Sequence, residues 1–198
     1  MGIQEHVKAE LSIGAVFDRD YRCEEELTQL KRKLENEIDF AHFHGRKEVE
    51  NYLLSPTILD RAATKAVKER ERRTGESRST DIDMVSALES ITSALKAEFS
   101  GQYIDKYCKY FKSSGRDQAT LATDALNIFE DKWSDIDSRM EIVAGKAVLR
   151  SLRERLQESH GITLTDWRIV DCYRVDEIPE DLVALLGRLE EFRNAADG

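Results

Sequence analysis

The sequence contains few residues that break or crosslink a chain. Only two prolines occur in 198 residues and 40% of the residues are hydrophobic, which favours a mostly helical protein with a substantial core. The cysteines, Cys23, Cys108 and Cys172, are odd in number and far apart, so neither a disulfide framework nor a zinc site can be built from them. This cysteine usage indicates a reducing compartment, and we expect a cytoplasmic protein.

Three further absences narrow the function. No run approaches the roughly 18 apolar residues of a membrane helix, so no membrane association is expected. The phosphate-binding motif of P-loop ATPases, G-x-x-x-x-G-K-[ST], does not occur in the sequence. The formal net charge of −9 argues against a surface that binds nucleic acid generally.

What is present begins with two aspartates at the end of a short apolar segment. Residues 13–17 predict a buried strand, and Asp18 and Asp20 follow it directly. Side chains two positions apart on an extended chain point to the same side. Adjacent carboxylates repel unless a cation lies between them, and hard oxygen ligands suit Mg²⁺ or Mn²⁺. The alternative is a pair that only solvates the strand end and starts a turn.

A second predicted strand is followed by another acidic segment. The strand lies around residues 40–44, and residues 46–53 read RKEVENYL. Strand, Asp-x-Asp, helix, strand and then Glu-x-Glu-Asn-Tyr is a distinctive order. Together with the Gly-Lys segment at 143–149 and the tail at 176–182, it resembles the TOPRIM nuclease region of the OLD (overcoming lysogenization defect) family. Proteins of that family join an ABC-type ATPase to a C-terminal TOPRIM domain.

The resemblance implies a divalent-metal site and a phosphate-binding lysine. Asp18 and Asp20 would hold Mg²⁺ or Mn²⁺, with Glu48 or Glu50 as a further ligand. On a helix the two glutamates diverge by about 200°, so only one would reach the metal, and Glu50 is favoured. Lys146 would bind the scissile phosphate, because developing charge there needs a fixed positive partner. Residues expected to contact nucleic acid are Arg46, Lys47, Arg150 and Arg153.

Two groups of basic residues and a pair of histidines can be explained without binding to nucleic acid or metal. Positive residues crowd between Lys65 and Arg78 and again between Arg150 and Arg155. Such groups are typical of solvated helix faces, with contact to nucleic-acid phosphates as the alternative. His42 and His44 would share one strand face near the acids, where a structural role is favoured over metal binding.

The front half of a TOPRIM domain is missing from the sequence. That domain normally begins with a strand that ends in a catalytic Glu, but only residues 1–12 precede the first predicted strand. One βαβ unit takes roughly 30 residues. Glu5 and Glu10 fall in an expected helical turn and do not match the family's Glu motif. We therefore expect the C-terminal portion of a larger protein, or a truncated relative.

The predicted fold is a partial, Rossmann-like α/β TOPRIM core with a mostly α-helical insertion and a helical tail. Residues 1–56 would form the α/β segment, 57–144 the insertion, and 145–198 the segment that completes the region. In the insertion, Thr80 or Asp81 is predicted to cap a long helix. Gly161 is predicted to end a later helix.

The leading functional hypothesis is a Mg²⁺- or Mn²⁺-dependent DNA endonuclease in phage or foreign-DNA defence. It would work with an ABC-type ATPase domain or subunit, and homodimer formation is left open. The alternative is a degenerate, non-catalytic TOPRIM remnant that docks an ATPase partner. A topoisomerase or primase TOPRIM is a weaker third option, because nothing resembles a transesterifying Tyr domain or a primase zinc ribbon.

Overall fold

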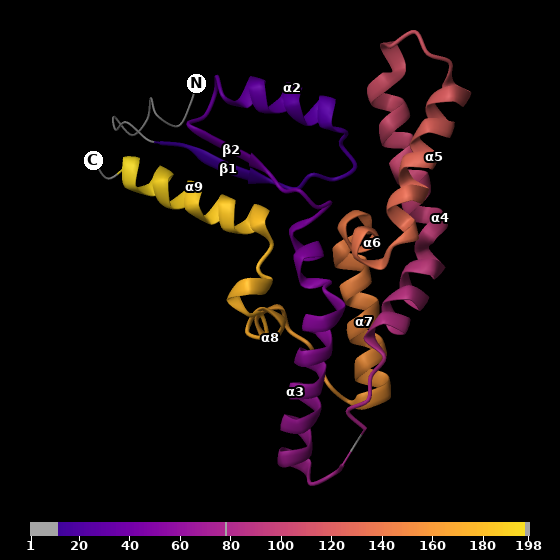
Figure 1. The fold of residues 1–198 in the computed structure, drawn as a ribbon, viewed down its shortest axis with the longest axis vertical. Helices are drawn as coiled ribbons and strands as arrows, with labels where there is room; N and C mark the ends of the chain where they lie inside the picture. The colour runs from indigo at the N-terminus through magenta and orange to yellow at the C-terminus, as the bar shows by residue number, and fades with distance from the viewer. Residues whose placement is uncertain (1–11, 78, 197–198) are drawn as a thin grey trace.

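The protein is mostly helical and contains one small parallel sheet, as Figure 1 shows. The computed structural model describes residues 12–77 and 79–196. In chain order the elements are β1 (Gly14–Phe17), α2 (Glu24–Leu34), β2 (Phe40–Phe43), the 3₁₀ helix η1 (Val49–Leu53), α3 (Pro56–Thr74), α4 (Met84–Tyr110), η2 (Phe111–Ser113), α5 (Gln118–Ser134), α6 (Ile136–Ile142), α7 (Gly145–His160), α8 (Asp166–Val170), η3 (Val175–Glu177) and α9 (Glu180–Ala196).

The sheet forms an α/β layer with helices on its two faces. Strands β1 and β2 are parallel, with Gly14 opposite Phe40 and Phe17 opposite Phe43. Helix α2 makes the crossover between them and lies on one side of the sheet, and α9 runs along the other side (Figure 1). The Phe192 ring of α9 packs against Phe40 with ring centroids 5.6 Å apart. The predicted order of strand, helix, strand is therefore confirmed.

The first strand is less buried than its apolar sequence predicts. Val16 is 41% exposed, and no residue of β1 or α2 is fully buried. In the part of the chain that the structure describes, β1 pairs only with β2, so its other edge has no strand beside it. The prediction of a buried strand was wrong because an apolar run does not specify how many neighbours will cover it.

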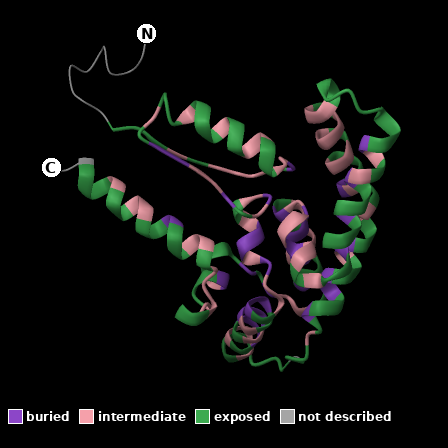
Figure 2. Ribbon diagram, turned by 45° about the horizontal axis from the view of Figure 1, so that its top comes forward, coloured by how far each residue is buried: buried purple, intermediate pink, exposed green. Residues whose placement is uncertain are grey.

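The main hydrophobic core lies among the helices α3 to α8. Leu88, Phe99, Phe129 and Leu152 are completely buried there. Figure 2 shows this buried surface along the inner sides of the helices, whereas α2 and α9 are mostly exposed. Helix α7 packs against α4 and η1. The segment predicted to begin at residue 145 thus shares its core with the predicted insertion.

Two predicted helix ends have different outcomes. Helix α4 is capped by Asp83, whose carboxylate accepts the Ser86 N–H at 2.9 Å, and not by Thr80 or Asp81. The prediction failed because three residues near the helix start could serve as the cap and only Asp83 directly precedes Met84. Gly161 does end α7, in the left-handed conformation with φ 65°.

Two further observations bear on the sequence predictions. The helical turn expected around Glu5 and Glu10 lies outside the described residues. Within residues 12–77 and 79–196, no helix is both long and apolar enough to span a membrane.

Candidate functional site

The carboxyl ends of both strands meet the start of η1. The His44 N–H donates to the Phe17 carbonyl at 3.0 Å, which extends the pairing by one residue past the strands. Further along, the Asp20 N–H donates to the Lys47 carbonyl at 2.8 Å. These bonds hold the loop after β1 beside the loop after β2. The acidic segment at 48–50 is thereby brought to the strand end that carries Asp18, as the sequence order predicted.

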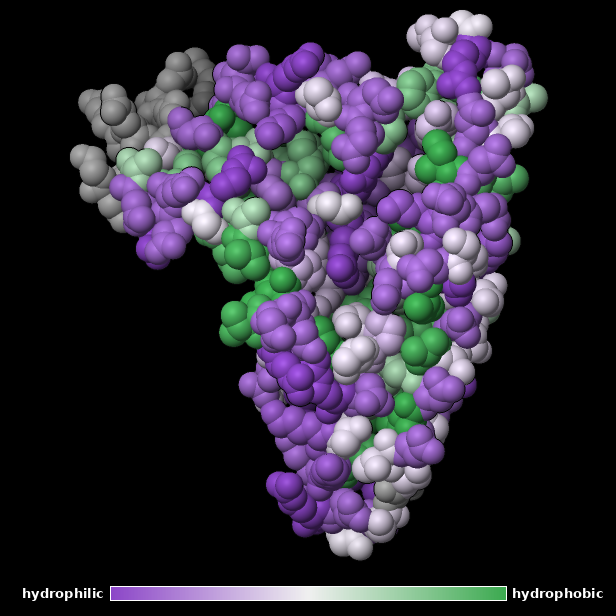
Figure 3. Space-filling view, viewed as in Figure 1, coloured by the Kyte–Doolittle hydropathy of each residue, from purple (hydrophilic) through white to green (hydrophobic). Residues whose placement is uncertain are grey.

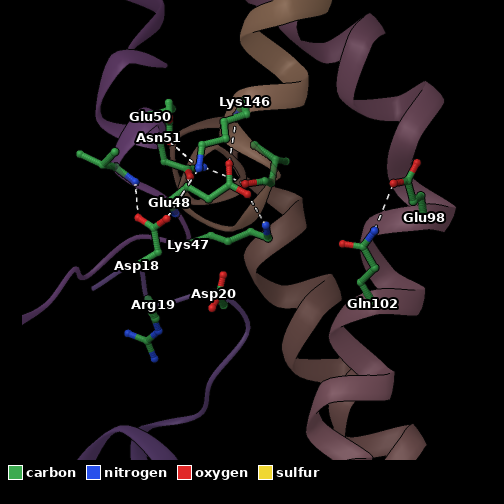
Figure 4. A network of polar contacts seen from close by, with 12 residues as sticks. Asp18, Arg19, Asp20, Lys47, Glu48, Glu50, Asn51, Glu98, Gln102 and Lys146 are labelled. Carbon is green, nitrogen blue, oxygen red and sulfur yellow. Dashed lines mark hydrogen bonds and ion pairs between the residues drawn. The ribbon is translucent and has the colours of Figure 1, made fainter. Parts of the chain in front are cut away.

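Asp18 is fixed at this edge by a backbone hydrogen bond. Its Oδ1 accepts the N–H of Val49, the first residue of η1, at 2.9 Å. The partial positive charge of an exposed helix N–H stabilises a carboxylate in this position. The other oxygen, Oδ2, lies 3.8 Å from Nζ of Lys146 (Figure 4).

Glu50 and Lys146 complete a cluster drawn from three separate elements. Oε2 of Glu50 lies 3.7 Å from the same Lys146 Nζ. The Glu50 carboxylate, and then Asp18, raise the pKa of the Lys146 ammonium above its usual value. Lys146 comes from the first turn of α7, and its side chain is 59% exposed. One ammonium therefore faces two carboxylates, and the lysine side chain is open to solvent.

The carboxylates of Asp18 and Glu50 are the residues here that could contribute to holding a divalent cation, with water as its other ligands. Oε2 of Glu50 is buried and makes no hydrogen bond to any described residue, so it has coordination capacity to spare. Mg²⁺ is often held by one or two carboxylates plus water and substrate phosphates, and Mn²⁺ accepts the same oxygen ligands. Among the described residues, no group of three or more His, Cys, Asp or Glu is placed to hold a metal. Asp18 and Glu50 would thus be the protein's only ligands from this part of the chain.

Glu48, which the sequence predicted as a possible metal ligand, is engaged by two other residues of the protein. Its Oε1 accepts from Lys47 Nζ at 2.6 Å, and its Oε2 accepts from the Lys146 backbone N–H at 3.0 Å. Burial raises the pKa of the Glu48 carboxyl. The hydrogen bonds from the Lys146 amide and the Lys47 ammonium lower it by more than burial raises it, so the pKa lies below its ordinary value. Glu48 therefore joins η1 to the start of α7 and positions Lys146.

A buried asparagine joins η1 to α6 and to the residue that ends α6. Asn51 is completely buried, and its Nδ2 donates to the Met140 and Val143 carbonyls at 2.7 and 2.9 Å. Its Oδ1 accepts the Glu48 N–H at 2.8 Å. A Cβ atom on Gly145 would lie 2.9 Å from the Asn51 backbone nitrogen. The glycine before Lys146 is thus required by close packing, a role that the sequence pattern alone did not indicate.

Asp20 lies apart from the cluster, although the sequence predicted it beside Asp18. Its Oδ2 pairs with Arg22 at 2.6 Å, and Figure 4 shows it away from Glu50 and Lys146. The prediction assumed an extended chain, but β1 ends at Phe17 and Asp20 has a left-handed φ of 52°. The two-residue alternation of a strand therefore does not apply to this pair. Metal binding by Asp20 stays a prediction that this geometry does not support.

Arg46 and Lys47, predicted to contact nucleic acid, are engaged inside the protein. The Arg46 guanidinium donates to the Asn51 carbonyl at 3.0 Å and lies 4.7 Å from the centre of the Tyr52 ring. Lys47 is only 8% exposed, and its ammonium lies 4.8 Å from the centre of the Tyr21 ring while it pairs with Glu48. Both residues organise the loop after β2, which leaves little of Lys47 for an external phosphate.

The other predicted contacts lie along the helices. Arg150 is exposed on α7, whereas Arg153 of the same helix is ion-paired with Asp166. On α3, Lys68, Arg72 and Arg73 are exposed, and Figure 3 shows this end of the molecule as strongly hydrophilic. Arg78 lies outside the described residues. Contact with nucleic acid remains a prediction for these side chains.

The two histidines lie together beside the site. The His42 and His44 rings are 5.7 Å apart, and His44 packs edge-on against Tyr52 at 5.5 Å. Burial lowers the pKa of both imidazoles. The Tyr52 hydroxyl donates to Asp181, which ties this aromatic group to the start of α9. These contacts agree with the structural role that the sequence favoured.

Comparisons with protein-family models, curated proteins and solved structures found no match for this chain.

Proposed function

We propose that this chain is the C-terminal TOPRIM part of an OLD-like endonuclease that hydrolyses DNA with Mg²⁺ or Mn²⁺. The observation that carries the proposal is the convergence of Asp18, Glu50 and Lys146 beyond the carboxyl end of a parallel strand. That edge of a sheet is where α/β folds bind their ligands. Two carboxylates and a cation are also the groups that a divalent metal and a phosphate need.

Each residue of the cluster has a distinct role in this proposal. Asp18 and Glu50 hold the divalent cation, which when bound activates water and stabilises the leaving oxygen. Lys146 binds a non-bridging oxygen of the phosphate and stabilises the charge that develops there. Glu48 keeps Lys146 in place through the backbone N–H of that lysine. DNA is the proposed substrate, and an ABC-type ATPase domain or subunit is the proposed partner in defence against foreign DNA.

Metal binding to single variants tests the proposed ligands. Mn²⁺ at about 100 times its Kd should stabilise the fold by about 2.7 kcal/mol, which raises the melting temperature by roughly 5–10 °C. Asp18→Asn and Glu50→Gln should each remove most of this shift. Asp20→Asn should retain it, because Asp20 pairs with Arg22. A full shift in the Asp18→Asn variant would overturn the assignment.

Cleavage by the chain is expected to be slow, because only two carboxylates converge among the described residues. Nicking of supercoiled plasmid with Mn²⁺ measures it, and the Asp18→Asn variant controls for contaminating nucleases. Robust nicking that needs Asp18 would show that two protein ligands suffice. Nicking at equal rates by both proteins would argue against the nuclease.

A second candidate is a non-catalytic module that docks an ATPase partner. The specific observation is that the Lys146 ammonium already lies within ion-pair distance of both Asp18 and Glu50 and offsets part of their negative charge without a metal. The open edge of β1 would give such a module a place for a partner strand. Absence of any Mn²⁺ shift, together with binding to an ABC-type ATPase, would favour this candidate.

A further inference from the structure

A cavity of about 340 Å³ lies between the loop after β1 and the helices α4 and α5. Asp20 and Lys47 contribute to its wall on the side of the strand ends, and Tyr103, Tyr107 and Ile128 contribute on the helical side. The cavity and the proposed cleavage site thus share the segment that follows β1. Lys47 in the cavity wall also pairs with Glu48, which accepts the Lys146 backbone N–H, so the two places are linked through neighbouring residues.

The helical wall of this cavity is aromatic. Tyr103 and Tyr107 are one turn apart on α4, and both are half-buried. The Tyr103 ring is held edge-on to Tyr21 at 5.6 Å, and Tyr107 packs against Phe111 at 4.6 Å. Their positions are therefore fixed before any ligand binds. Preorganised rings of this kind suit a flat aromatic partner.

The charged groups around the cavity balance one another. Four cationic side chains face four carboxylates, and three pairs are in contact: Arg19 with Glu24 at 2.6 Å, Arg22 with Asp20 at 2.6 Å and Lys132 with Glu141 at 3.3 Å. The cavity consequently has little net charge with which to hold a phosphate. It instead offers hydrogen-bond donors and acceptors side by side, which match the edge of a neutral heterocycle.

One further polar atom in the wall has no partner. Tyr21 lines the cavity and is 9% exposed, and its hydroxyl is buried without a hydrogen bond to any described residue. A buried hydroxyl that makes no hydrogen bond costs free energy. Because this oxygen is closed to solvent, a ligand would satisfy it only after the Tyr21 side chain turned toward the cavity. Carbonyl and ring-nitrogen acceptors on a heterocycle would serve.

We propose that this cavity binds one unpaired nucleobase of the DNA strand whose phosphate lies at Asp18, Glu50 and Lys146. The inference rests on the proposed function, because it takes its substrate class from the neighbouring cluster. The volume has room for a single base and its sugar but not for stacked base pairs. Base stacking on tyrosine supplies affinity without demanding a particular sequence. The nuclease would accordingly prefer single-stranded, flapped or distorted DNA to intact duplex.

A strand with a single base tests the inference directly. The probe is a short oligonucleotide of abasic residues that carries one 2-aminopurine, and the reference is the same strand with no base. Binding is measured in EDTA, so that no bond is cleaved, and is then repeated with Mn²⁺. Wild type should bind the base-bearing strand about 10-fold more tightly, and its fluorescence should be quenched by stacking.

Two tyrosine variants assign the preference to the cavity. Tyr107→Leu should abolish the preference for the base, because Tyr107 lines the cavity. Tyr110→Leu is the matched control, since Tyr110 packs against the same Phe111 ring from one turn further along α4. Near-ultraviolet circular dichroism would show that both variants remain folded.

The possible results distinguish the proposal of a base-binding cavity from the proposal of a metal-dependent nuclease. Equal binding of the two strands by wild type, no binding of either, or equal losses in the two variants would overturn the inference. A Tyr107-dependent preference without any Mn²⁺ shift would uphold the base-binding cavity and reject the nuclease. A Mn²⁺ shift that needs Asp18, without a base preference, would do the reverse.

Discussion

At the scale of single residues, the Lys146 ammonium lies near the oxygens of Asp18 and Glu50, the two carboxylates proposed to hold a metal ion. It lies 3.8 and 3.7 Å from their oxygens. Lys146→Met should therefore raise Mn²⁺ affinity roughly 3- to 10-fold, which is what two partly exposed ion pairs are worth. Any DNA cleavage that depends on Asp18 should slow about 10²-fold on the same change, because one preorganised stabilising group is lost. Calorimetric Mn²⁺ titration and single-turnover cleavage measure the two effects.

Arg150→Met is the matched control for this prediction. Arg150 is exposed on α7, one turn after Lys146. Its replacement should leave both the Mn²⁺ affinity and the single-turnover rate nearly unchanged. The variants are compared at one fixed salt concentration, because DNA affinity depends on salt. Unchanged Mn²⁺ affinity in Lys146→Met would show that the ammonium does not compete with metal.

The hydrogen bonds of Glu48 predict a pH-dependent contribution to stability. Its folded-state pKa is lowered, so its contribution is complete above the ordinary value of 4.5 and is lost as the pH falls through the folded-state pKa. Glu48→Gln should cost roughly 2–3 kcal/mol at neutral pH, because it leaves the buried Lys47 charge unpaired. The difference from wild type should shrink steadily below pH 4.5.

Urea unfolding across the pH range checks this prediction. Glu158→Gln is the control, because Glu158 is exposed on α7 and its replacement should change stability by less than about 0.5 kcal/mol at any pH. A difference between wild type and Glu48→Gln that stays constant with pH would mean that the Glu48 charge does not stabilise the fold.

The sequence identified the acidic residues but could not assign their roles. The divergence of side chains on a helix implies that only one of Glu48 and Glu50 reaches a metal, and the family resemblance favours Glu50. Glu50 is the one that shares the Lys146 ammonium with Asp18. Asp20 was paired with Asp18 on the assumption of an extended chain. The left-handed turn at Asp20 depends on the bond from its N–H to Lys47, a contact between distant segments that no local pattern encodes.

At the scale of elements, the joint between η1 and α7 determines where Lys146 lies. Gly145→Ala would place a methyl group 2.9 Å from the Asn51 backbone nitrogen, so the start of α7 must move. We expect a loss of about 1–3 kcal/mol in stability and a cleavage rate reduced along with it. Denaturant unfolding and the nicking assay measure the two quantities.

A second glycine provides the opposite expectation. Gly101 is exposed in the middle of α4, and a Cβ atom there would meet nothing within 4 Å. Gly101→Ala should therefore stabilise the protein by about 0.5–1 kcal/mol through helix propensity alone. If both substitutions behaved alike, the close packing at Gly145 would not be the reason for its glycine.

The elements themselves were largely predictable, because short-range signals define them. Gly161, for example, located the end of α7, because a glycine tolerates the left-handed conformation that ends a helix. The tertiary role of Asn51 was not predictable in the same way. Its partners, the carbonyls of Met140 and Val143, are about 90 positions away along the chain and have no side-chain signature. A buried amide of this kind is found only once the elements are packed.

At the scale of the whole molecule, burial is unevenly distributed between the helical core and the α/β layer. The sequence predicted both the α/β layer and the helical part, because apolar residues recur with different spacings in strands and in amphipathic helices. It could not predict how exposed the layer is, because burial depends on how many elements cover it. Among the described residues, α7 has five buried positions, whereas α2 has none.

This difference predicts unequal local stability. Two-stranded sheets are marginal unless they are packed on other elements, and segments with few buried apolar contacts open with small free energies. Amide hydrogen exchange measured by mass spectrometry should therefore be faster in β1 and α2 than in α4 and α7. In the Glu48→Gln variant, β1 and α2 should still exchange faster than α4 and α7. The substitution should increase exchange more in α7 than in the other elements, because the Lys146 N–H in the first turn of α7 loses its carboxylate partner. If the amides of β1 in the isolated chain were as protected from exchange as those of α7, the prediction would be wrong. That result would mean that another part of the protein, or a second copy, covers the open edge of the sheet.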